Sequence, residues 1–232
     1  MGIINKIYEK LLDEYSYQGW WPLLDYDGSN PTKTGSIQGY HPKDYSFPNN
    51  GREQFEIIMG AILTQNTSWP SVEKALINLK ELIDFTPSEV LNLDEDKFKE
   101  AIRPAGYYNQ KYNYLRNMSE FYLSLEGKTP TRSQLLEVKG IGNETADSIL
   151  LFAYKEKEFI VDSYTKRILS YLGLIDSNDG YLKVKNFIED EFKGDIFQYQ
   201  EFHALIVEHA KRFYSKKPYG ADDLLLQKFK VD

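Results

Sequence analysis

The sequence predicts an all-α fold. Apolar residues recur at helical spacing along most of the chain, as in Phe55, Ile58, Met59 and Ile62. No segment shows the sustained alternation of a half-buried strand, and the β-like runs are short, such as Phe159-Ile160-Val161. Clusters of Gly, Pro, Ser and Asn interrupt the helical pattern at short intervals. We therefore expect about ten short helices joined by tight turns.

The composition restricts the classes of protein to consider. The 232 residues carry a formal net charge of -7 and include no cysteine. The acidic balance argues against broad nonspecific adhesion to nucleic acid but leaves room for a local basic face. Without cysteine the chain has no disulfide framework, no thiolate zinc site and no cysteine-ligated iron–sulfur cluster. The histidines, His41, His203 and His209, lack metal-ligand spacing, so we expect no metal site.

The N-terminal residues resemble neither a membrane span nor a signal peptide. No apolar run reaches the ~18 residues that a transmembrane helix needs. Residues 3–15 place Ile3, Ile7, Leu11 and Leu12 on one helical face and lack the basic start and apolar core of a signal peptide. We therefore expect a cytoplasmic protein without membrane contact.

Residues 16–51 break the helical pattern. They hold Trp20-Trp21-Pro22 and dense breakers such as Pro48-Asn49-Asn50-Gly51, which rule out a long helix. A loop of this length in a compact domain is usually functional or partly disordered. The sequence assigns no role to residues 23–50.

The helical pattern returns at residue 52 and continues to residue 215. Ser68 and Thr131 suit helix N-caps, and Pro70 suits a first turn. The expected helices cover 52–63, 68–83, a short stretch from 86, 94–102, 108–125, 131–138, 143–154, 163–172, 180–192 and 198–215.

Residues 136–162 carry the clearest chemical signal. Gly140-Ile141-Gly142 precedes a helix-forming run, and Asp162 follows about twenty residues later. A glycine turn that opens a helix offers free N–H groups and the positive end of the helix dipole to a phosphate. Glycines are also common at ordinary helix corners, and Asp is a favoured N-cap. The N-cap role of Asp162 is compatible with a catalytic one.

Other polar and aromatic residues have two interpretations. Gln65, in the tetrad Thr64-Gln65-Asn66-Thr67, could be functional or could end a helix. The three tryptophans could line a site or anchor the core. The basic pairs 166–167, 211–212 and 216–217 usually mark solvated faces, although here they gather in the C-terminal part.

Taken together, these residues resemble the helix-hairpin-helix DNA glycosylases of the endonuclease III superfamily, from about residue 52 to residue 218. The resemblance rests on four markers in order, at 61–67, 102–111, 138–146 and 161–162. Trp20-Trp21-Pro22, with Trp69 after the tetrad, is most similar to the branch that acts on 3-methyladenine-type alkylated purines.

The resemblance implies an enzyme of base excision repair that binds damaged double-stranded DNA and flips the damaged nucleotide into a cleft. Asp162 would be the catalytic carboxylate, which activates water or stabilises positive charge at C1′ as the N-glycosidic bond breaks. Gln65 would fill the gap left by the flipped base. The DNA contacts implied are Gln65, Asn66, Lys139, Gly140, Ile141, Gly142, Asn143, Thr145 and Arg212.

The resemblance also implies an aromatic base pocket of Trp20, Trp21 and Trp69, with Trp21 and Trp69 as walls and Lys211 beside them. Indole faces stack on a cationic alkylated purine and attract its charge. The basic residues Lys211, Arg212, Lys216 and Lys217 are further candidate phosphate contacts. In this family a monovalent cation on hairpin carbonyls often helps to hold the phosphate.

Two departures from the family pattern matter. Glu144 stands where bifunctional members have the lysine that forms a Schiff base, so lyase activity is not expected. The region 209–218 has no cysteine where many members bind an iron–sulfur cluster, so that cluster is absent.

The resulting prediction is a monomeric, monofunctional glycosylase for alkylated purines, located at the nucleoid when bound to DNA. A six-helix lobe (52–158) would contain the helix-hairpin-helix at about 131–155. Residues 1–51 and 159–232 would form a second lobe, with the active-site cleft between the two. Two alternatives stay open: a glycosylase for oxidised or deaminated bases with lyase activity, and a noncatalytic DNA-binding protein in which Asp162 only caps a helix.

Overall fold

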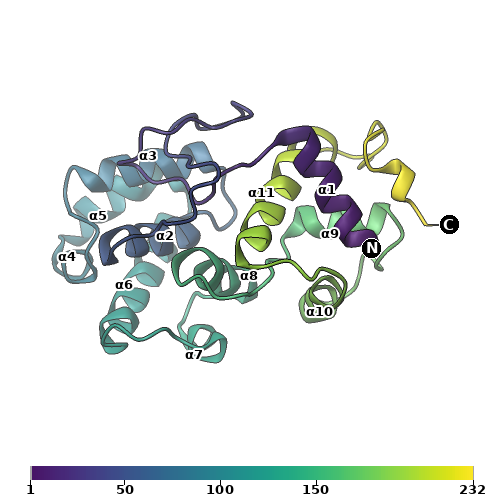
Figure 1. The fold of residues 1–232 in the computed structure, drawn as a ribbon. Coiled ribbons are helices and arrows are strands. Elements are labelled where there is room, and N and C mark those ends of the chain that lie inside the picture. The colour runs from purple at the N-terminus through teal and green to yellow at the C-terminus, as the bar shows by residue number, and fades with distance from the viewer. Residues whose placement is uncertain (1, 232) are drawn as a thin grey trace.

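The computed structural model describes residues 2–231, and within this range the chain is helical without a strand. A single isolated bridge pairs Ser29 with Gln38. The all-α prediction is confirmed (Figure 1). The α-helices are α1 (Ile3–Tyr15), α2 (Gly51–Leu63), α3 (Trp69–Lys80), α4 (Pro87–Asn92), α5 (Glu95–Ile102), α6 (Tyr108–Ser124), α7 (Arg132–Glu137), α8 (Asn143–Ser148), α9 (Ser163–Tyr171), α10 (Tyr181–Glu191) and α11 (Ile196–Phe213).

Three shorter elements complete the chain. The 3-10 turns are η1 (Arg103–Ala105) and η3 (Gln227–Phe229), and a π-helical turn, η2 (Ile149–Ala153), continues α8. All five residues of η2 are buried. The hairpin helix therefore runs from an exposed N-terminus straight into the core.

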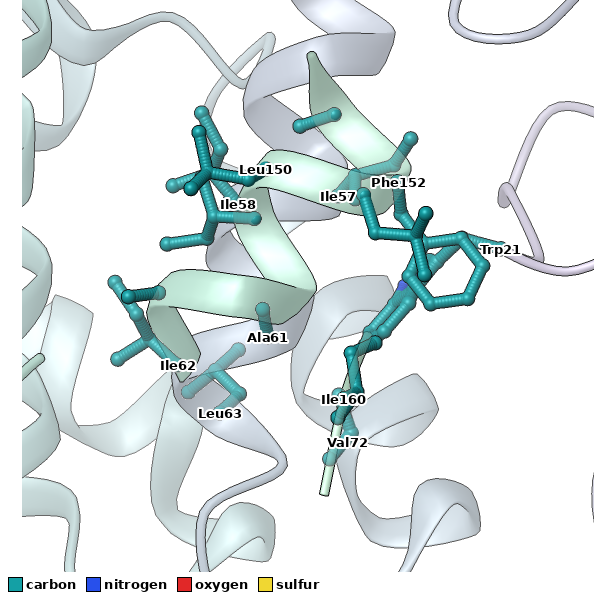
Figure 2. Packing of buried hydrophobic residues seen from close by; sticks show 14 of the residues in the cluster. Trp21, Ile57, Ile58, Ala61, Ile62, Leu63, Val72, Leu150, Phe152 and Ile160 are labelled. Carbon is teal, nitrogen blue, oxygen red and sulfur yellow. The ribbon is translucent and has the colours of Figure 1, made fainter. Parts of the chain in front are cut away.

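Helix α2 is the centre of the first group of helices. Every residue from Phe55 to Leu63 is buried, as expected of a helix surrounded by protein. It packs against α3, α6, α8 and η2. Figure 2 shows Leu150 of η2 beside Ile58 of α2, with Phe152 of η2 and Trp21 together on the other side, near Ile57.

A second group joins the two ends of the chain. Helix α1 packs against α10 and α11, and α9 packs against α11, so the N-terminal helix lies among C-terminal ones (Figure 1). Near the C-terminus the Val231 amide donates to the Leu172 carbonyl at 2.9 Å. The predicted lobe boundaries, 52–158 and 1–51 plus 159–232, stay a prediction.

Residues 16–50, here called the strap, connect the two groups without regular structure. Four buried or half-buried glutamates of the helices hold the strap. On α11, Glu201 accepts from the amides of Gln18 (2.7 Å) and Gly19 (3.1 Å), and Glu208 accepts from the Thr34 hydroxyl (2.6 Å). In the other group, Glu56 accepts from the Leu24 amide (2.7 Å) and Glu73 from the Ser36 hydroxyl (2.7 Å).

The strap also has its own internal hydrogen bonds. The buried Asn30 amide group donates to the carbonyls of Thr34 (2.9 Å) and Ser36 (3.0 Å). The His41 ring lies between the carbonyls of Trp21 and Asp44, at 2.8 and 2.7 Å. These contacts give the segment a defined path although it contains no helix.

Within residues 2–231, no helix combines the length and the apolar character that crossing a membrane would require.

The Glu56 carboxyl group, which anchors the strap, makes the stability of the fold depend on pH. Burial raises its pKa to about 7, because the charged carboxylate loses water. The folded state therefore holds this proton more tightly than the unfolded chain, and the stability that results is lost as pH rises from about 4.5 through about 7.

We predict that Glu56→Gln leaves stability unchanged near pH 4.5 and raises it by up to about 3 kcal/mol at pH 8. The amide oxygen still accepts from Leu24 but carries no charge. Urea unfolding at both pH values measures the difference, with exposed Glu120→Gln on α6 as control. An equal effect of Glu56→Gln at both pH values would contradict the prediction.

Candidate active site

The hairpin between α7 and α8 exposes backbone amides. Gly140 has φ +103°, and a Cβ there would lie 2.2 Å from the Tyr114 ring, so only glycine fits. Ile141 is buried and anchors the turn. Around Gly142 no atom lies within 4 Å of a Cβ position, and no side chain in the described range caps α8. The start of α8 is therefore accessible to a ligand from outside.

Asp147 lies fully buried behind the hairpin and receives several donors. Arg132 of α7 donates from Nε at 2.7 Å, Tyr181 of α10 donates its hydroxyl at 2.7 Å, and Lys185 lies at 3.1 Å. Arg132 also donates to the Asn143 side chain at 2.7 Å. The hydroxyl oxygen of Tyr181 accepts from the Val161 amide at 3.3 Å. This network connects the hairpin to the residue before Asp162.

Gln65 contacts the hairpin directly. Its Nε2 donates to the Gly140 carbonyl and to Thr145 Oγ1, both at 3.0 Å. Its neighbour Asn66 is exposed with φ +54°. Lys139 is exposed, and its carbonyl accepts from Asn117 at 3.1 Å. The structure thus brings the end of α2 and the hairpin, predicted separately as DNA contacts, into one surface.

Lys111 was part of a sequence marker, but its position was not predicted. It is 2% exposed and donates from Nζ to the carbonyls of Leu63 (2.7 Å) and Ala105 (2.8 Å). Burial lowers its pKa to about 8. The signal was available in the sequence, because Lys111, Leu115 and Met118 follow helical spacing on the buried face of α6. Lys111 joins the end of α2 to the turn before α6.

Asp162 is the N-cap of α9. Its Oδ1 accepts from the Thr165 amide at 2.7 Å and from the Thr165 hydroxyl at 2.8 Å. Its Oδ2 accepts no hydrogen bond from residues 2–231, and the residue is half-buried. The capping role weighed from the sequence is therefore present, and it leaves one carboxylate oxygen for other partners.

Two titratable groups respond to Asp162. Glu144 lies in dense surroundings although its side chain reaches solvent, and this desolvation, followed by the negative charge of Asp162, raises its pKa to about 7. Burial lowers the pKa of His203, while the Asp162 charge and the Ile160 carbonyl partly oppose that shift. His203 Nδ1 is buried and has no hydrogen-bond partner within the described part of the chain.

The tryptophans form one aromatic cluster with Phe152 and His203. Trp21 is buried and meets Trp69 edge to face, with ring centroids 5.3 Å apart and planes at 85°. Trp20 is half-buried and contacts the Trp21, Phe152 and His203 rings at 6.1, 6.3 and 5.9 Å. Trp21 and Trp69 touch, so a base has no gap between them and would lie against the outside of the cluster.

Lys211 and Arg212, at the end of α11, both pair with Glu208. Lys211 Nζ lies 3.8 Å from Glu208, and Arg212 donates to the same carboxylate and stacks over the Tyr15 ring at 4.6 Å. Desolvation by neighbouring atoms lowers the pKa of Lys211. Neither basic group reaches the aromatic cluster through a described contact. To bind a DNA phosphate, Lys211 and Arg212 would have to give up part of their pairing with Glu208.

Two hollows of the structure are lined by residues that the sequence analysis named. One, of about 220 Å³, lies between the strap and α3 and includes Trp69 in its lining. The other, of about 690 Å³, lies beside α9 and is lined by Lys166, Arg167, Ser170, Tyr171, Ser177, Lys217, Pro218 and Tyr219. Asp162 lines neither of them.

A match to a protein-family model shows the family to which this chain belongs. The model described as "HhH-GPD superfamily base excision DNA repair protein" matches residues 59–193, more than half of the chain. The chain belongs to this superfamily. The resemblance inferred from the sequence is confirmed, and the protein is a DNA glycosylase of base excision repair that acts on DNA.

Full-length relatives agree with the family. "Putative DNA repair glycosylase MJ1434" of Methanocaldococcus jannaschii is 41% identical over 226 residues, which cover 93% of this chain and 90% of that one. Endonuclease III of Sulfolobus acidocaldarius is 28% identical over 225 residues, covering 94% and 91%.

Solved structures show the same fold. The Helicobacter pylori 3-methyladenine DNA glycosylase MagIII, bound to 1,N6-ethenoadenine, matches with a TM-score of 0.68 at 27% identity, covering 91% of this chain and 98% of that one. A non-covalent endonuclease III–DNA complex matches with a TM-score of 0.72 at 17% identity, covering 96% and 92%, and supports the fold alone.

Gly60 of α2 makes room for Trp21, since a Cβ there would lie 2.9 Å from the Trp21 indole nitrogen. We predict that Gly60→Ala destabilises the protein by about 1 kcal/mol and shifts its tryptophan emission, because the indole must move. Urea unfolding and fluorescence measure both effects.

Gly51→Ala is the matched control in the same helix, because its Cβ would lie at an ordinary 3.6 Å from the Tyr122 hydroxyl. If Gly60→Ala behaved like Gly51→Ala in both measurements, the steric interpretation would be wrong.

Proposed function

We propose that this glycosylase is monofunctional and removes alkylated purines of the 3-methyladenine type, acting as a monomer. The observation that carries the proposal is Asp162, which keeps one carboxylate oxygen free at the start of α9. The aromatic cluster of Trp20, Trp21 and Trp69, next to His203, supports the substrate class. So does the likeness to the H. pylori structure, whose protein is named a 3-methyladenine DNA glycosylase.

The hairpin would hold the DNA backbone. The amides at Gly142 and Asn143 stand at the open start of α8, where the helix dipole favours a phosphate. Lys139 is exposed on the same turn and adds a charge, and Ile141 fixes the turn from inside. Thr145 is engaged by Gln65, so its contribution is to position the neighbouring turn.

Gln65 and Asn66 would face the gap that the flipped nucleotide leaves in the duplex. Gln65 is held by two hydrogen bonds to the hairpin. The residue that enters the DNA duplex and the turn that binds the phosphate are therefore joined in one unit. Arg212 would add a phosphate contact from α11, at the cost of part of its pairing with Glu208.

Asp162 would stabilise the positive charge that develops on the sugar as the N-glycosidic bond breaks, and would orient the attacking water. A cationic alkylated purine leaves as a neutral base, so it needs little help from an acid. The half-exposed Trp20 and Trp69 would offer the indole faces on which this cation stacks. Lys211 pairs with Glu208 and has no described contact with these rings.

A monovalent cation on the hairpin would need several carbonyl oxygens at once. The carbonyls of Val138, Lys139 and Gly140 already accept hydrogen bonds from Ile141, Asn117 and Gln65. No step of the proposed reaction depends on such a cation.

We predict that Asp162→Asn abolishes release of methylated purines while leaving DNA affinity within a few-fold of wild type. Asn still caps a helix, so the loss reports the missing charge. Base release is measured by chromatography and DNA binding by titration of a labelled duplex.

Asp195→Asn is the matched control, since Asp195 also caps a helix and accepts from the Gln198 amide at 2.8 Å. It should keep full activity. Base release by Asp162→Asn would remove Asp162 from the mechanism.

We predict that borohydride traps no covalent adduct between the wild-type enzyme and a damaged duplex. A carboxylate at position 144 forms no imine, and Lys111 is buried with its ammonium bound to two carbonyls. Gel mobility after reduction tests this, with a lysine-dependent family member as positive control. A trapped adduct would favour the alternative of a bifunctional enzyme.

A further inference from the structure

We propose that Glu144 is a specificity-determining residue that makes base release favour cationic purines over neutral ones. This inference rests on the proposed glycosylase reaction at Asp162 and assigns a role to a carboxylate which that reaction leaves unused.

The Glu144 carboxylate is unusual because it has no partner within residues 2–231. No hydrogen-bond donor and no cation contacts it, and only its backbone carbonyl is used, by the Ser148 hydroxyl at 2.7 Å. Asp147, three residues later on the same helix, is surrounded by Arg132, Lys185 and Tyr181. The free carboxylate on α8 is therefore available to a ligand.

The fold connects the helix that carries this carboxylate to the residue before Asp162. Tyr181 donates to Asp147 and accepts from the Val161 amide, which ties α8 to the residue before Asp162. The negative charge of Asp162 is the second cause, after desolvation, of the rise in the pKa of Glu144 to about 7. Glu144 and Asp162 stand at the starts of α8 and α9, the two helices that Tyr181 connects.

The basic groups of the neighbouring helices α7 and α10 are paired with other carboxylates. Arg132 from α7 and Lys185 from α10 both pair with Asp147, and Lys185 also pairs with Glu158. Burial, followed by Asp147, raises the pKa of Tyr181 well above its usual range, so this group stays neutral. The protonation state of Glu144 therefore changes near neutral pH.

The charge of Glu144 acts differently on the two kinds of substrate. As the C1′–N bond breaks, its electron pair goes to the base, and the oxygen of water then bonds to C1′ and loses its proton to Asp162. A cationic purine leaves neutral, so a second carboxylate only stabilises the positive sugar. A neutral purine leaves as an anion, which an ionised Glu144 repels and a protonated Glu144 stabilises by donating its proton.

The test compares release of 3-methyladenine from methylated DNA with release of 1,N6-ethenoadenine from a duplex, between pH 6 and pH 8.5. For wild type the ratio of the two kcat/KM values, cationic over neutral, should rise with pH around 7. Glu144→Gln should flatten this profile and lower 3-methyladenine release at pH 8 about tenfold. It should leave 1,N6-ethenoadenine release at pH 8 unchanged or higher.

Glu144→Asp, which keeps the charge, should retain the pH-dependent preference and remains informative if the Gln variant folds poorly. Glu137→Gln, an exposed carboxylate on α7, should behave as wild type. Equal losses on both substrates, or an unchanged ratio, would overturn the role of Glu144. Failure of wild type to release either base would instead overturn the proposed function.

Discussion

The buried charge of Asp147 is the constraint on which the site depends. A carboxylate with no exposure to solvent is costly unless it is paired, and removing one partner of such a group typically costs about 3–5 kcal/mol. Its partners come from α7 and α10, and Tyr181 passes the connection on to the amide of Val161. The buried Asp147 carboxylate thus fixes the hairpin, helix α10 and the residue before Asp162.

Several of the acidic residues have a structural role, which explains part of an acidic composition that is unusual for a DNA-binding protein. Glu56 and Glu201 are buried and accept hydrogen bonds from strap amides, while Glu73 and Glu208 accept from strap hydroxyls. These carboxyl groups lie inside the molecule or along the strap. The net charge of -7 is therefore an average over the molecule and does not describe the proposed DNA-binding surface around Lys139.

The helices and the hairpin were predictable because local patterns determine them. The spacing of Phe55, Ile58 and Ile62 places α2, and Gly140 marks the turn because Tyr114 leaves no room for a side chain. The path of the strap was not predictable, since its anchors Glu201 and Glu208 lie more than 150 residues away in sequence. The edge-to-face contact of Trp21 with Trp69 depends on that path, as does the space beside Gly60. Lys111 was missed because a lysine on an apolar face contradicts the usual burial rule until its two carbonyl acceptors are known.

In the proposed mechanism, Asp162 serves the fold and the chemistry at the same time. Oδ1 accepts both hydrogen bonds from Thr165 and fixes the start of α9, while the preceding amide is held by Tyr181. The carboxylate is thus restrained from both sides before any substrate arrives, which is what electrostatic stabilisation of a developing charge requires. Because Oδ1 takes the structural role, Oδ2 can face the substrate without loosening the helix.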